Sequence, residues 1–300
     1  MTRMDLRGVF APIPTPFNRN GQLDAARLRA ACARWASSPL TGIVVLGSTG
    51  EAVLLDEDES DRTVAAARAA WPSGRPFIVG AGRESTVATI HAVHRAAALG
   101  ADAVLVRTPG FYKAQMNTDV FVRHYTAVAD ASSVPVLLYN FTAVTGVNLL
   151  PAAVSTLSAH PNIIGVKESG GDLSQIAGFV TGTPDGFNVL AGSSTTFLSA
   201  LGVGATGGIL ALSCVLPDAC VQLFELARTG KRVEASALQE RLLGIAKLVG
   251  TMHGIAGLKA ALKLVGCDVG GPRSPLAPVS DATVGVLREA LVSFEEIALV

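Results

Sequence analysis

Eight short apolar runs, each followed by a segment of helical periodicity, constrain the fold of this chain most strongly. The runs are rich in β-branched residues and almost continuously apolar, as is typical of parallel strands covered on both faces by helices. Strands are predicted at residues 8–12, 42–46, 77–81, 103–107, 135–139, 163–167, 188–191 and 207–210. Helices are predicted at residues 24–37, 56–71, 85–99, 118–131, 150–158, 173–181, 195–201 and 216–227. Eight such units favour an α/β fold, a (β/α)8 TIM barrel, over residues 1–229.

A doubly wound open sheet is the alternative fold. Such a sheet carries a glycine-rich fingerprint after its first strand, whereas Ile13-Pro-Thr-Pro-Phe follows the first strand here. The barrel is therefore the better prediction. Residues 230–300 hold three further predicted helices, at 232–249, 255–265 and 281–290. We expect them to form a C-terminal helical extension that packs on the barrel.

The composition excludes several classes of partner. Lys+Arg and Asp+Glu both number 24, and aromatic residues make up only 5 % of the chain. Neither a nucleic acid nor an anionic membrane is therefore an expected partner. No stretch reaches the ~18 uninterrupted apolar residues of a membrane-spanning helix, and the N-terminus lacks the apolar core of a secretory signal. We expect a cytoplasmic protein that binds a small molecule.

Metal and redox motifs are not apparent in the sequence. His91 and His94 lie on a predicted helix away from the strand ends, where a surface histidine pair is the simpler interpretation, and no acidic or histidine cluster completes a ligand set. No P-loop, GxSxG or HExxH motif occurs, so neither a metal nor a cofactor is expected. None of the cysteines forms a CxxC pair, which favours free buried thiols at Cys32, Cys214, Cys220 and Cys267.

Lys167 is the lysine that ends an apolar strand. In a TIM barrel the working groups lie at the carboxyl ends of the strands. Burial between apolar walls disfavours the charged form of a lysine, and a neutral amine can attack a ketone to form a Schiff base. Two interpretations stay open at this point: a Schiff-base lysine, or a structural lysine that pairs with Glu168 or Asp172.

Tyr139 ends the preceding strand, and neighbouring parallel strands bring it close to Lys167. Two interpretations are open for this phenol. It either transfers protons during a reaction, or it fills the barrel as a structural side chain whose hydroxyl is hydrogen-bonded. Gly47-Ser-Thr-Gly-Glu follows the second strand, and its glycines allow a turn whose N–H groups and hydroxyls bind a carboxylate. A plain capped turn is the alternative for this motif.

Together these strand-end motifs resemble the dihydrodipicolinate synthase / N-acetylneuraminate lyase family of Schiff-base aldolases. The resemblance covers nearly the whole chain. It implies that Lys167 forms the imine, that Tyr139 moves protons, and that Ser48 and Thr49 hold the carboxylate of pyruvate. It also implies that the main-chain carbonyl of Ile209 faces the site, that no cofactor is needed, and that the protein is a homotetramer.

Some positions depart from the family pattern. Synthase members carry an arginine five residues after the tyrosine, for the carboxylate of the second substrate, where this chain has Val144. Thr142 replaces the usual proline. In the family, a tyrosine that relays protons reaches into the site from a neighbouring subunit. The corresponding position in this chain is Phe111 or, with a shift of one residue, Tyr112.

The second half of the chain resembles a narrower branch, 4-hydroxy-2-oxoglutarate aldolase. Thr108-Pro-Gly-Phe-Tyr-Lys, Val166-Lys-Glu-Ser-Gly-Gly-Asp and Gly271-Pro-Arg-Ser-Pro-Leu carry this resemblance. It implies that Ser169 touches the substrate. Thr49 stands where that branch has an asparagine.

The sequence therefore predicts a metal-free lyase that cleaves a 4-hydroxy-2-oxo acid into pyruvate and an aldehyde. The expected substrate is 4-hydroxy-2-oxoglutarate, and the expected aldehyde is glyoxylate. The alternatives are 4-hydroxy-tetrahydrodipicolinate synthase, which condenses pyruvate with aspartate semialdehyde, and a non-catalytic barrel that binds 2-oxo acids. An isomerase of phosphorylated sugars is a further alternative, because Gly204-Ala-Thr-Gly-Gly is suited to cradling a phosphate.

Overall fold

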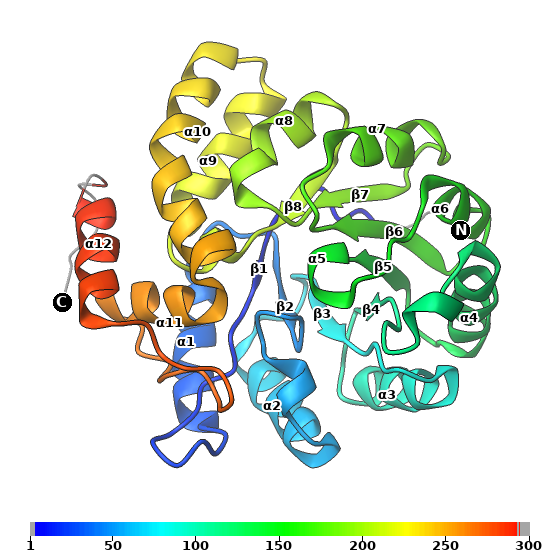
Figure 1. Cartoon of the computed structure of the whole chain (residues 1–300), viewed down its shortest axis with the longest axis horizontal. Coiled ribbons are helices and arrows are strands. Elements are labelled where there is room, and N and C mark those ends of the chain that lie inside the picture. The colour runs from blue at the N-terminus through cyan, green and yellow to red at the C-terminus, as the bar shows by residue number, and fades with distance from the viewer. Residues whose placement is uncertain (1–3, 293, 295–300) are drawn as a thin grey trace.

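Eight parallel strands close into a barrel in the order of the chain (Figure 1). The computed structural model describes residues 4–292 and 294. The strands are β1 (Gly8–Pro12), β2 (Gly42–Val45), β3 (Phe77–Gly80), β4 (Ala103–Arg107), β5 (Val136–Asn140), β6 (Ile163–Glu168), β7 (Asn188–Ala191) and β8 (Gly207–Ile209). Each begins and ends within one residue of its predicted position, so the predicted TIM barrel is confirmed.

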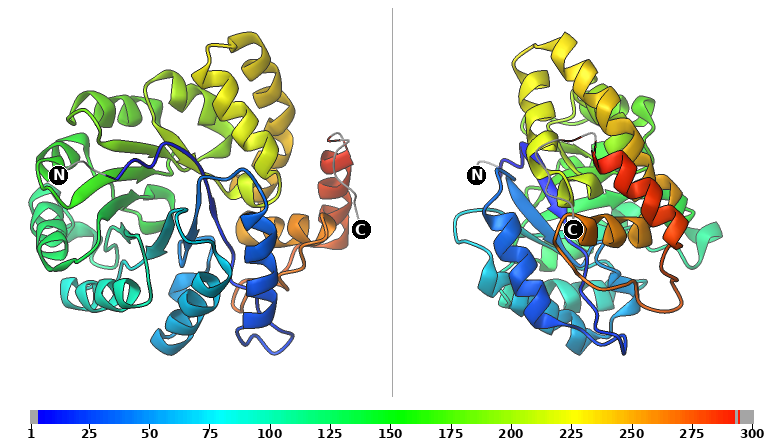
Figure 2. Two further views of the ribbon diagram at one scale, coloured as in Figure 1. Left: turned by 180° about the vertical axis from the view of Figure 1, so that it is seen from behind. Right: turned by 90° about the vertical axis from the view of Figure 1, so that its left-hand side faces the viewer.

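Helices follow the strands and surround the barrel (Figures 1 and 2). They are α1 (Ala25–Ala36), α2 (Glu57–Ala70), α3 (Thr86–Ala98), α4 (Thr118–Ala131), α5 (Thr142–Thr145), α6 (Pro151–Ser158), α7 (Leu173–Thr181), α8 (Phe197–Gly202) and α9 (Pro217–Arg228). Polar caps fix where several of them begin. Asp24 accepts a hydrogen bond from the Arg27 N–H, and Asp56 forms a capping box with Glu59. The four-residue helix α5 was not predicted.

Two apolar cores hold the barrel together. The larger core lies between the strands and the surrounding helices. The smaller core fills the barrel interior, and Phe10, Val44, Leu105, Leu137 and Ile209 are among its side chains. Such an interior is packed with side chains and is not a channel. The four cysteines are free and buried, as predicted.

The C-terminal helices lie beside one flank of the barrel (Figure 2). They are α10 (Arg232–Lys247), a π-helical turn at Leu248–Met252, α11 (Gly254–Leu264) and α12 (Asp281–Val292). Helix α10 packs against α9 and α12. The division into a barrel at 1–229 and an extension at 230–300 stays a prediction, and residues 1–3, 293 and 295–300 lie outside the described residues. Within residues 4–292 and 294, no helix is both long and apolar enough to cross a membrane.

The interpretation of Gly204-Ala-Thr-Gly-Gly as a phosphate cradle at the active end of the barrel is wrong. This segment leads into β8, which begins at Gly207. It therefore lies at the amino ends of the strands, whereas the groups that act in TIM barrels follow the carboxyl ends.

Candidate active site

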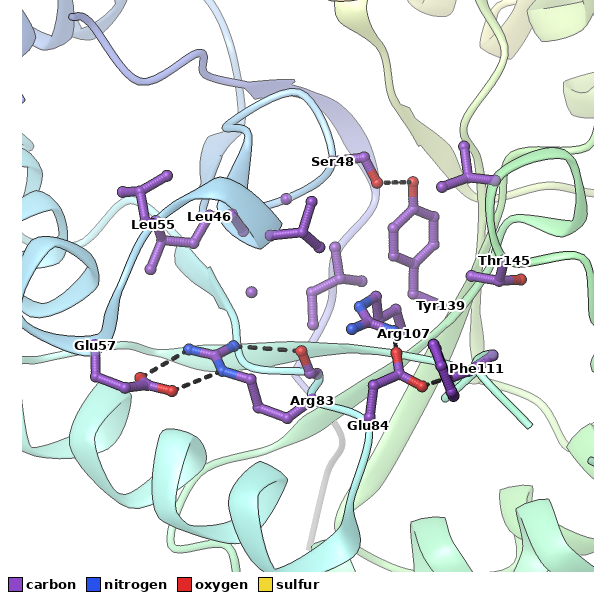
Figure 3. A pocket seen from close by; sticks show the side chains of 18 of the residues that line it. Leu46, Ser48, Leu55, Glu57, Arg83, Glu84, Arg107, Phe111, Tyr139 and Thr145 are labelled. Carbon is purple, nitrogen blue, oxygen red and sulfur yellow. Dashed lines mark hydrogen bonds and ion pairs between the residues drawn. The ribbon is translucent and has the colours of Figure 1, made fainter. Parts of the chain in front are cut away.

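A cavity of about 750 Å³ lies at the carboxyl ends of β2 to β5 (Figure 3). The segments that follow these strands provide its walls. Among its lining residues are Ser48, Arg83, Glu84, Arg107, Phe111, Lys113, Tyr139, Val144 and Thr145. The cavity is thus bordered by two of the predicted site residues, Ser48 and Tyr139, and by several charged groups that were not among the predicted site residues.

The loop that carries Ser48 begins with a sharp change of direction. Leu46 has a left-handed backbone with a φ of 56°, which is uncommon for a residue with a side chain. Its carbonyl oxygen lies so close to β3 that a Cβ at Gly80 would be 1.9 Å from it. Only glycine fits at position 80, and its absence of a side chain lets β2 turn over β3 and direct the next residues toward the cavity.

Two N–H groups of this loop are available for a ligand. The N–H groups of Gly50 and Glu51 donate to the carbonyls of Gly47 and Ser48 within the turn. In the described part of the chain, the N–H groups of Ser48 and Thr49 have no hydrogen-bond partner. The predicted anion-binding turn is therefore smaller than the full motif, because the N–H groups of Gly50 and Glu51 close the turn itself.

The hydroxyl groups of Ser48 and Tyr139 lie 3.1 Å apart and form a hydrogen bond (Figure 3). Tyr139 is buried at the carboxyl end of β5, and its ring stacks on that of Phe141 with centroids 6.1 Å apart. The ring is thereby fixed with its hydroxyl in the cavity. A proton can pass along this pair, since either hydroxyl is able to donate.

Lys167 lies beside Tyr139 on the adjacent strand. The two residues are partners in the β5–β6 register, and Lys167 Nζ is 4.4 Å from the centroid of the Tyr139 ring. Only 4 % of Lys167 is exposed. The structure thus brings the predicted amine and the predicted phenol together at one end of the barrel.

The ion-pair alternative for Lys167 is wrong. The Glu168 carboxylate accepts hydrogen bonds from Asn140 Nδ2 at 2.7 Å and from Gln175 Nε2 at 2.6 Å. Asp172 caps α7 through the N–H groups of Ser174 and Gln175. Among the described residues, neither carboxylate forms an ion pair with Lys167.

Glu168 is itself an unusual group, because it is buried without a cation. Burial raises the pKa of its carboxyl group, while the hydrogen bonds from Asn140, the Gly170 N–H and Gln175 oppose that shift. Asn148 completes the cluster, since it accepts from Asn140 at 2.7 Å and donates to Gln175 at 2.8 Å. These contacts lock the segment after Lys167 in place.

The other predicted site residues lie around this centre at varying depth. Ile209 is fully buried in the barrel interior, in the same apolar cluster as Tyr139. Ser169 follows β6, where its N–H donates to Asn140 O at 3.0 Å and its Oγ faces Gly192. Phe111 and Tyr112 lie in the segment between β4 and α4 and are 74 % and 71 % exposed.

A buried ion pair that was not predicted from the sequence supports the Ser48 loop. Glu51 Oε1 lies 2.6 Å from Lys259 Nζ, and Glu51 Oε2 accepts from the Arg273 N–H at 2.8 Å. Lys259 Nζ also donates to the carbonyls of Thr15 and Gly271. The C-terminal segment therefore holds the loop whose first residues line the cavity.

No group of three or more His, Cys, Asp or Glu side chains that could hold a metal occurs within residues 4–292 and 294. His91 and His94 are exposed on α3, and the His94 ring bonds Ala131 O at 2.9 Å. A metal-free reaction stays a prediction.

Comparison with known proteins decides the family. The sequence model of the dihydrodipicolinate synthetase family matches residues 5–293. The chain belongs to this family. Enzymes of the dihydrodipicolinate synthetase family are pyruvate-dependent lyases that act through a Schiff base on a lysine, and this chain is an enzyme of that class.

Individual members of the dihydrodipicolinate synthetase family differ in their named substrates. The chain is 35% identical over 290 residues to a 4-hydroxy-tetrahydrodipicolinate synthase of Exiguobacterium, covering 97% of this chain and 98% of that one. It is 36% identical over 288 residues to a probable mitochondrial 4-hydroxy-2-oxoglutarate aldolase of Emericella nidulans, covering 94% and 93%. Dihydrodipicolinate synthase of Thermotoga maritima superposes with a TM-score of 0.92 at 31% identity, covering 97% and 99%.

Proposed function

We propose that this enzyme cleaves 4-hydroxy-2-oxoglutarate into pyruvate and glyoxylate, with Lys167 as the Schiff-base lysine. The observation that carries the proposal is the contact of Lys167 Nζ with the Tyr139 ring, 4.4 Å from its centroid, together with the Ser48–Tyr139 hydrogen bond of 3.1 Å. An amine, a phenol and a hydroxyl meet there at the carboxyl end of a barrel. Those are the groups that imine formation and proton transfer at a neighbouring hydroxyl require.

The first steps make the imine. Lys167 Nζ attacks the C2 ketone, and the resulting carbinolamine loses water to give a protonated imine. Ser48 and Thr49 hold the adjacent carboxylate through their hydroxyls and free N–H groups. Burial of Lys167 keeps bulk water away from the imine.

The next steps break the carbon–carbon bond. Tyr139 gives its proton to the hydroxyl that leaves the carbinolamine as water, and the resulting phenolate then accepts the proton of the C4 hydroxyl as the C3–C4 bond breaks. The bonding electrons move to the imine nitrogen, which leaves the enamine of pyruvate and releases glyoxylate. Protonation at C3 restores the imine, and water hydrolyses it to pyruvate and free Lys167.

The position of Val144 supports a substrate other than that of the synthases. Val144 lines the cavity and is exposed, and its side chain offers no hydrogen-bond donor. An acceptor carboxylate would find no cation at this position. The Emericella relative, named as a probable 4-hydroxy-2-oxoglutarate aldolase, supports the same substrate.

The second candidate is 4-hydroxy-tetrahydrodipicolinate synthase. The name of the Exiguobacterium relative favours it. A barrel that only binds 2-oxo acids is disfavoured, because a buried lysine beside a phenol serves no purpose in binding alone.

A homotetramer is part of the proposal. Phe111 and Tyr112 pack edge to face with ring centroids 5.1 Å apart and are largely exposed. Exposed aromatic side chains are frequent in subunit contacts. Tyr112 would then act as a proton relay in the site of a neighbouring subunit.

Turnover with defined substrates tests the proposal. Purified enzyme is given 4-hydroxy-2-oxoglutarate, and the pyruvate released is measured by coupled reduction with lactate dehydrogenase. In parallel, pyruvate is mixed with aspartate semialdehyde. We expect pyruvate release in the first assay and slow condensation in the second. Efficient condensation with the semialdehyde and no cleavage would assign the enzyme to the synthases instead.

A further inference from the structure

Arg107 stands in a row with Tyr139 and Lys167. Arg107 is the register partner of Tyr139 between β4 and β5, and Tyr139 is the partner of Lys167 between β5 and β6. Neighbouring strands lie about 4.8 Å apart, so the row from Lys167 to Arg107 spans roughly 10 Å at the backbone. Three consecutive strands thus present an amine, a phenol and a guanidinium side by side.

The side chain of Arg107 points to the same side as the barrel interior. Side chains alternate along a strand, and Ala103 and Leu105 of β4 belong to the interior core. Arg107 follows Leu105 by two residues, at the mouth of the barrel. It lines the same cavity as Ser48 and Tyr139, and Figure 3 shows it just below the Tyr139 ring.

Arg107 still has donors to offer. Its Nη1 donates to Glu84 Oε1 at 2.6 Å and to Thr108 O at 3.2 Å. In the part of the chain that the structure describes, its Nε and Nη2 have no partner. These two nitrogens form the pair of parallel donors that a carboxylate can accept in a bidentate contact.

The other arginine of the cavity is already occupied. Arg83 donates from Nε and Nη2 to the two oxygens of Glu57, at 3.0 Å each, and from Nη1 to Gly82 O. Lys113 lies on an exposed turn at the rim. Arg107 is therefore the cation of this cavity that is both directed inward and incompletely paired.

Glu84 holds Arg107 without satisfying all of it. Glu84 Oε2 accepts the N–H groups of Gly110 and Phe111 at 2.9 Å each, which leaves Oε1 for one guanidinium nitrogen. The carboxylate thereby fixes the direction of the guanidinium. A guanidinium held in this way is pre-oriented for a second anion.

We infer that Arg107 binds the carboxylate carried by the aldehyde half of the substrate. The inference rests on the proposed function and deepens it. The row of side chains matches the order of groups along 4-hydroxy-2-oxoglutarate: Lys167 at C2, Tyr139 at the C4 hydroxyl and Arg107 at the C5 carboxylate. Arg107 on β4 thus provides the donor for the distal carboxylate that Val144 cannot provide.

The test compares two substrates that differ only in the distal group. 4-Hydroxy-2-oxoglutarate carries a carboxylate there, and 4-hydroxy-2-oxopentanoate carries a methyl group. Arg107→Gln removes the charge, and Arg83→Gln is the matched control in the same cavity. Since the ratio of the two kcat/KM values is measured in one preparation, it does not depend on how much of the variant is folded.

We expect Arg107→Gln to lower kcat/KM for the dicarboxylate roughly 10- to 100-fold, the usual size for a lost hydrogen bond to a charged group. Cleavage of 4-hydroxy-2-oxopentanoate should change less than about twofold, and Arg83→Gln should leave the ratio as it is in the wild type. An equal fall for both substrates, or no fall for either, would overturn the assignment.

A separate measurement distinguishes this inference from the proposed function. If the wild-type enzyme cleaves neither substrate, condensation of pyruvate with aspartate semialdehyde is compared with condensation with acetaldehyde, because only the former aldehyde carries a carboxylate. A selective loss with the semialdehyde in Arg107→Gln would support Arg107 while the proposed substrate fails. Equal rates of condensation with the semialdehyde in wild type and Arg107→Gln would overturn both the role of Arg107 and the proposed substrate.

Discussion

Lys259 Nζ and Glu51 Oε1 lie 2.6 Å apart in a place where both side chains are almost completely inaccessible to solvent. Burial lowers the pKa of the Lys259 ammonium group, while the bond to Glu51 opposes that shift. Glu51 ends the loop that begins at Gly47, and its backbone is left-handed with a φ of 55°. The pair therefore fastens a strained turn to the C-terminal helices.

Replacing Lys259 by Met should destabilise the enzyme by about 3–5 kcal/mol, because it leaves the Glu51 carboxylate buried without a cation. Urea unfolding measures the change. The double variant Glu51→Gln/Lys259→Met removes the stranded charge and should recover part of the loss. A loss below about 1 kcal/mol in the single variant, as expected for a surface pair, would contradict the burial of this ion pair.

Lys167→Ala should abolish both turnover and covalent capture of pyruvate. No other described lysine ends an apolar strand beside a phenol. Intact mass after incubation with pyruvate and borohydride reports the reduced adduct. Lys263→Ala, which removes an exposed lysine of α11, is the control and should trap pyruvate like the wild type. An adduct that survives in Lys167→Ala would refute the assignment.

Ser169→Ala should lower kcat/KM for 4-hydroxy-2-oxoglutarate roughly 10- to 100-fold, since a hydrogen bond to a charged group contributes about 1.5–3 kcal/mol. Capture of pyruvate alone should be unchanged, because its carboxylate is assigned to Ser48 and Thr49. Steady-state cleavage and trapping are compared in the same variant. If both fall together, Ser169 supports Lys167 and does not contact the distal half of the substrate.

The stability of the enzyme should fall between pH 6.5 and 4 because of His124. Burial lowers the pKa of this histidine to about 4, and the nearby positive charge of Arg107 acts in the same direction. The unfolded chain takes up a proton near pH 6.5 and the native state does so only near pH 4, so acid favours unfolding across this interval. A shift of this size corresponds to about 3 kcal/mol.

His124→Asn should reduce the fall in stability between pH 6.5 and 4 relative to the wild type, because asparagine does not titrate. The amide oxygen can still accept from Thr86, whose hydroxyl lies 2.9 Å from His124 Nδ1. His91→Asn replaces an exposed histidine and is the control, so the fall in stability should be the same as in the wild type. Urea midpoints at pH 4.5 and 7 measure the effect, and parallel curves for wild type and His124→Asn would contradict it.

The strands and their ends could be predicted because buried parallel strands are almost continuously apolar, so the first polar residue marks where each one stops. Tyr139 and Lys167 were found by that rule. Arg107 obeys the same rule, and its alternation with Leu105 was a usable signal that it faces the barrel mouth. Arg107 was nevertheless not among the predicted site residues.

Other features had no local signal. Glu51 and Lys259 lie in different parts of the chain, and each looks like an ordinary charged residue until the fold brings them together. Helix α5, at Thr142–Thr145, is too short to show a period of 3.6 residues. The hydrogen bonds that hold Glu168 come from three segments, so its separation from Lys167 follows only from the folded geometry.

The hydrogen bonds of Arg273 to Glu51 and Glu59 affect when the site can form during synthesis of the chain. Arg273 follows Glu51 by 222 residues and Glu59 by 214, yet it bonds both. A nascent chain emerges N-terminus first, so all eight strands are made before Lys259 and Arg273 exist. A growing chain thus passes through a stage in which all eight strands have been made while the Ser48 loop still lacks its contacts with Lys259 and Arg273. Activity should therefore appear only after the last part of the chain has been made, and a chain that stops after residue 229 should have no enzyme activity.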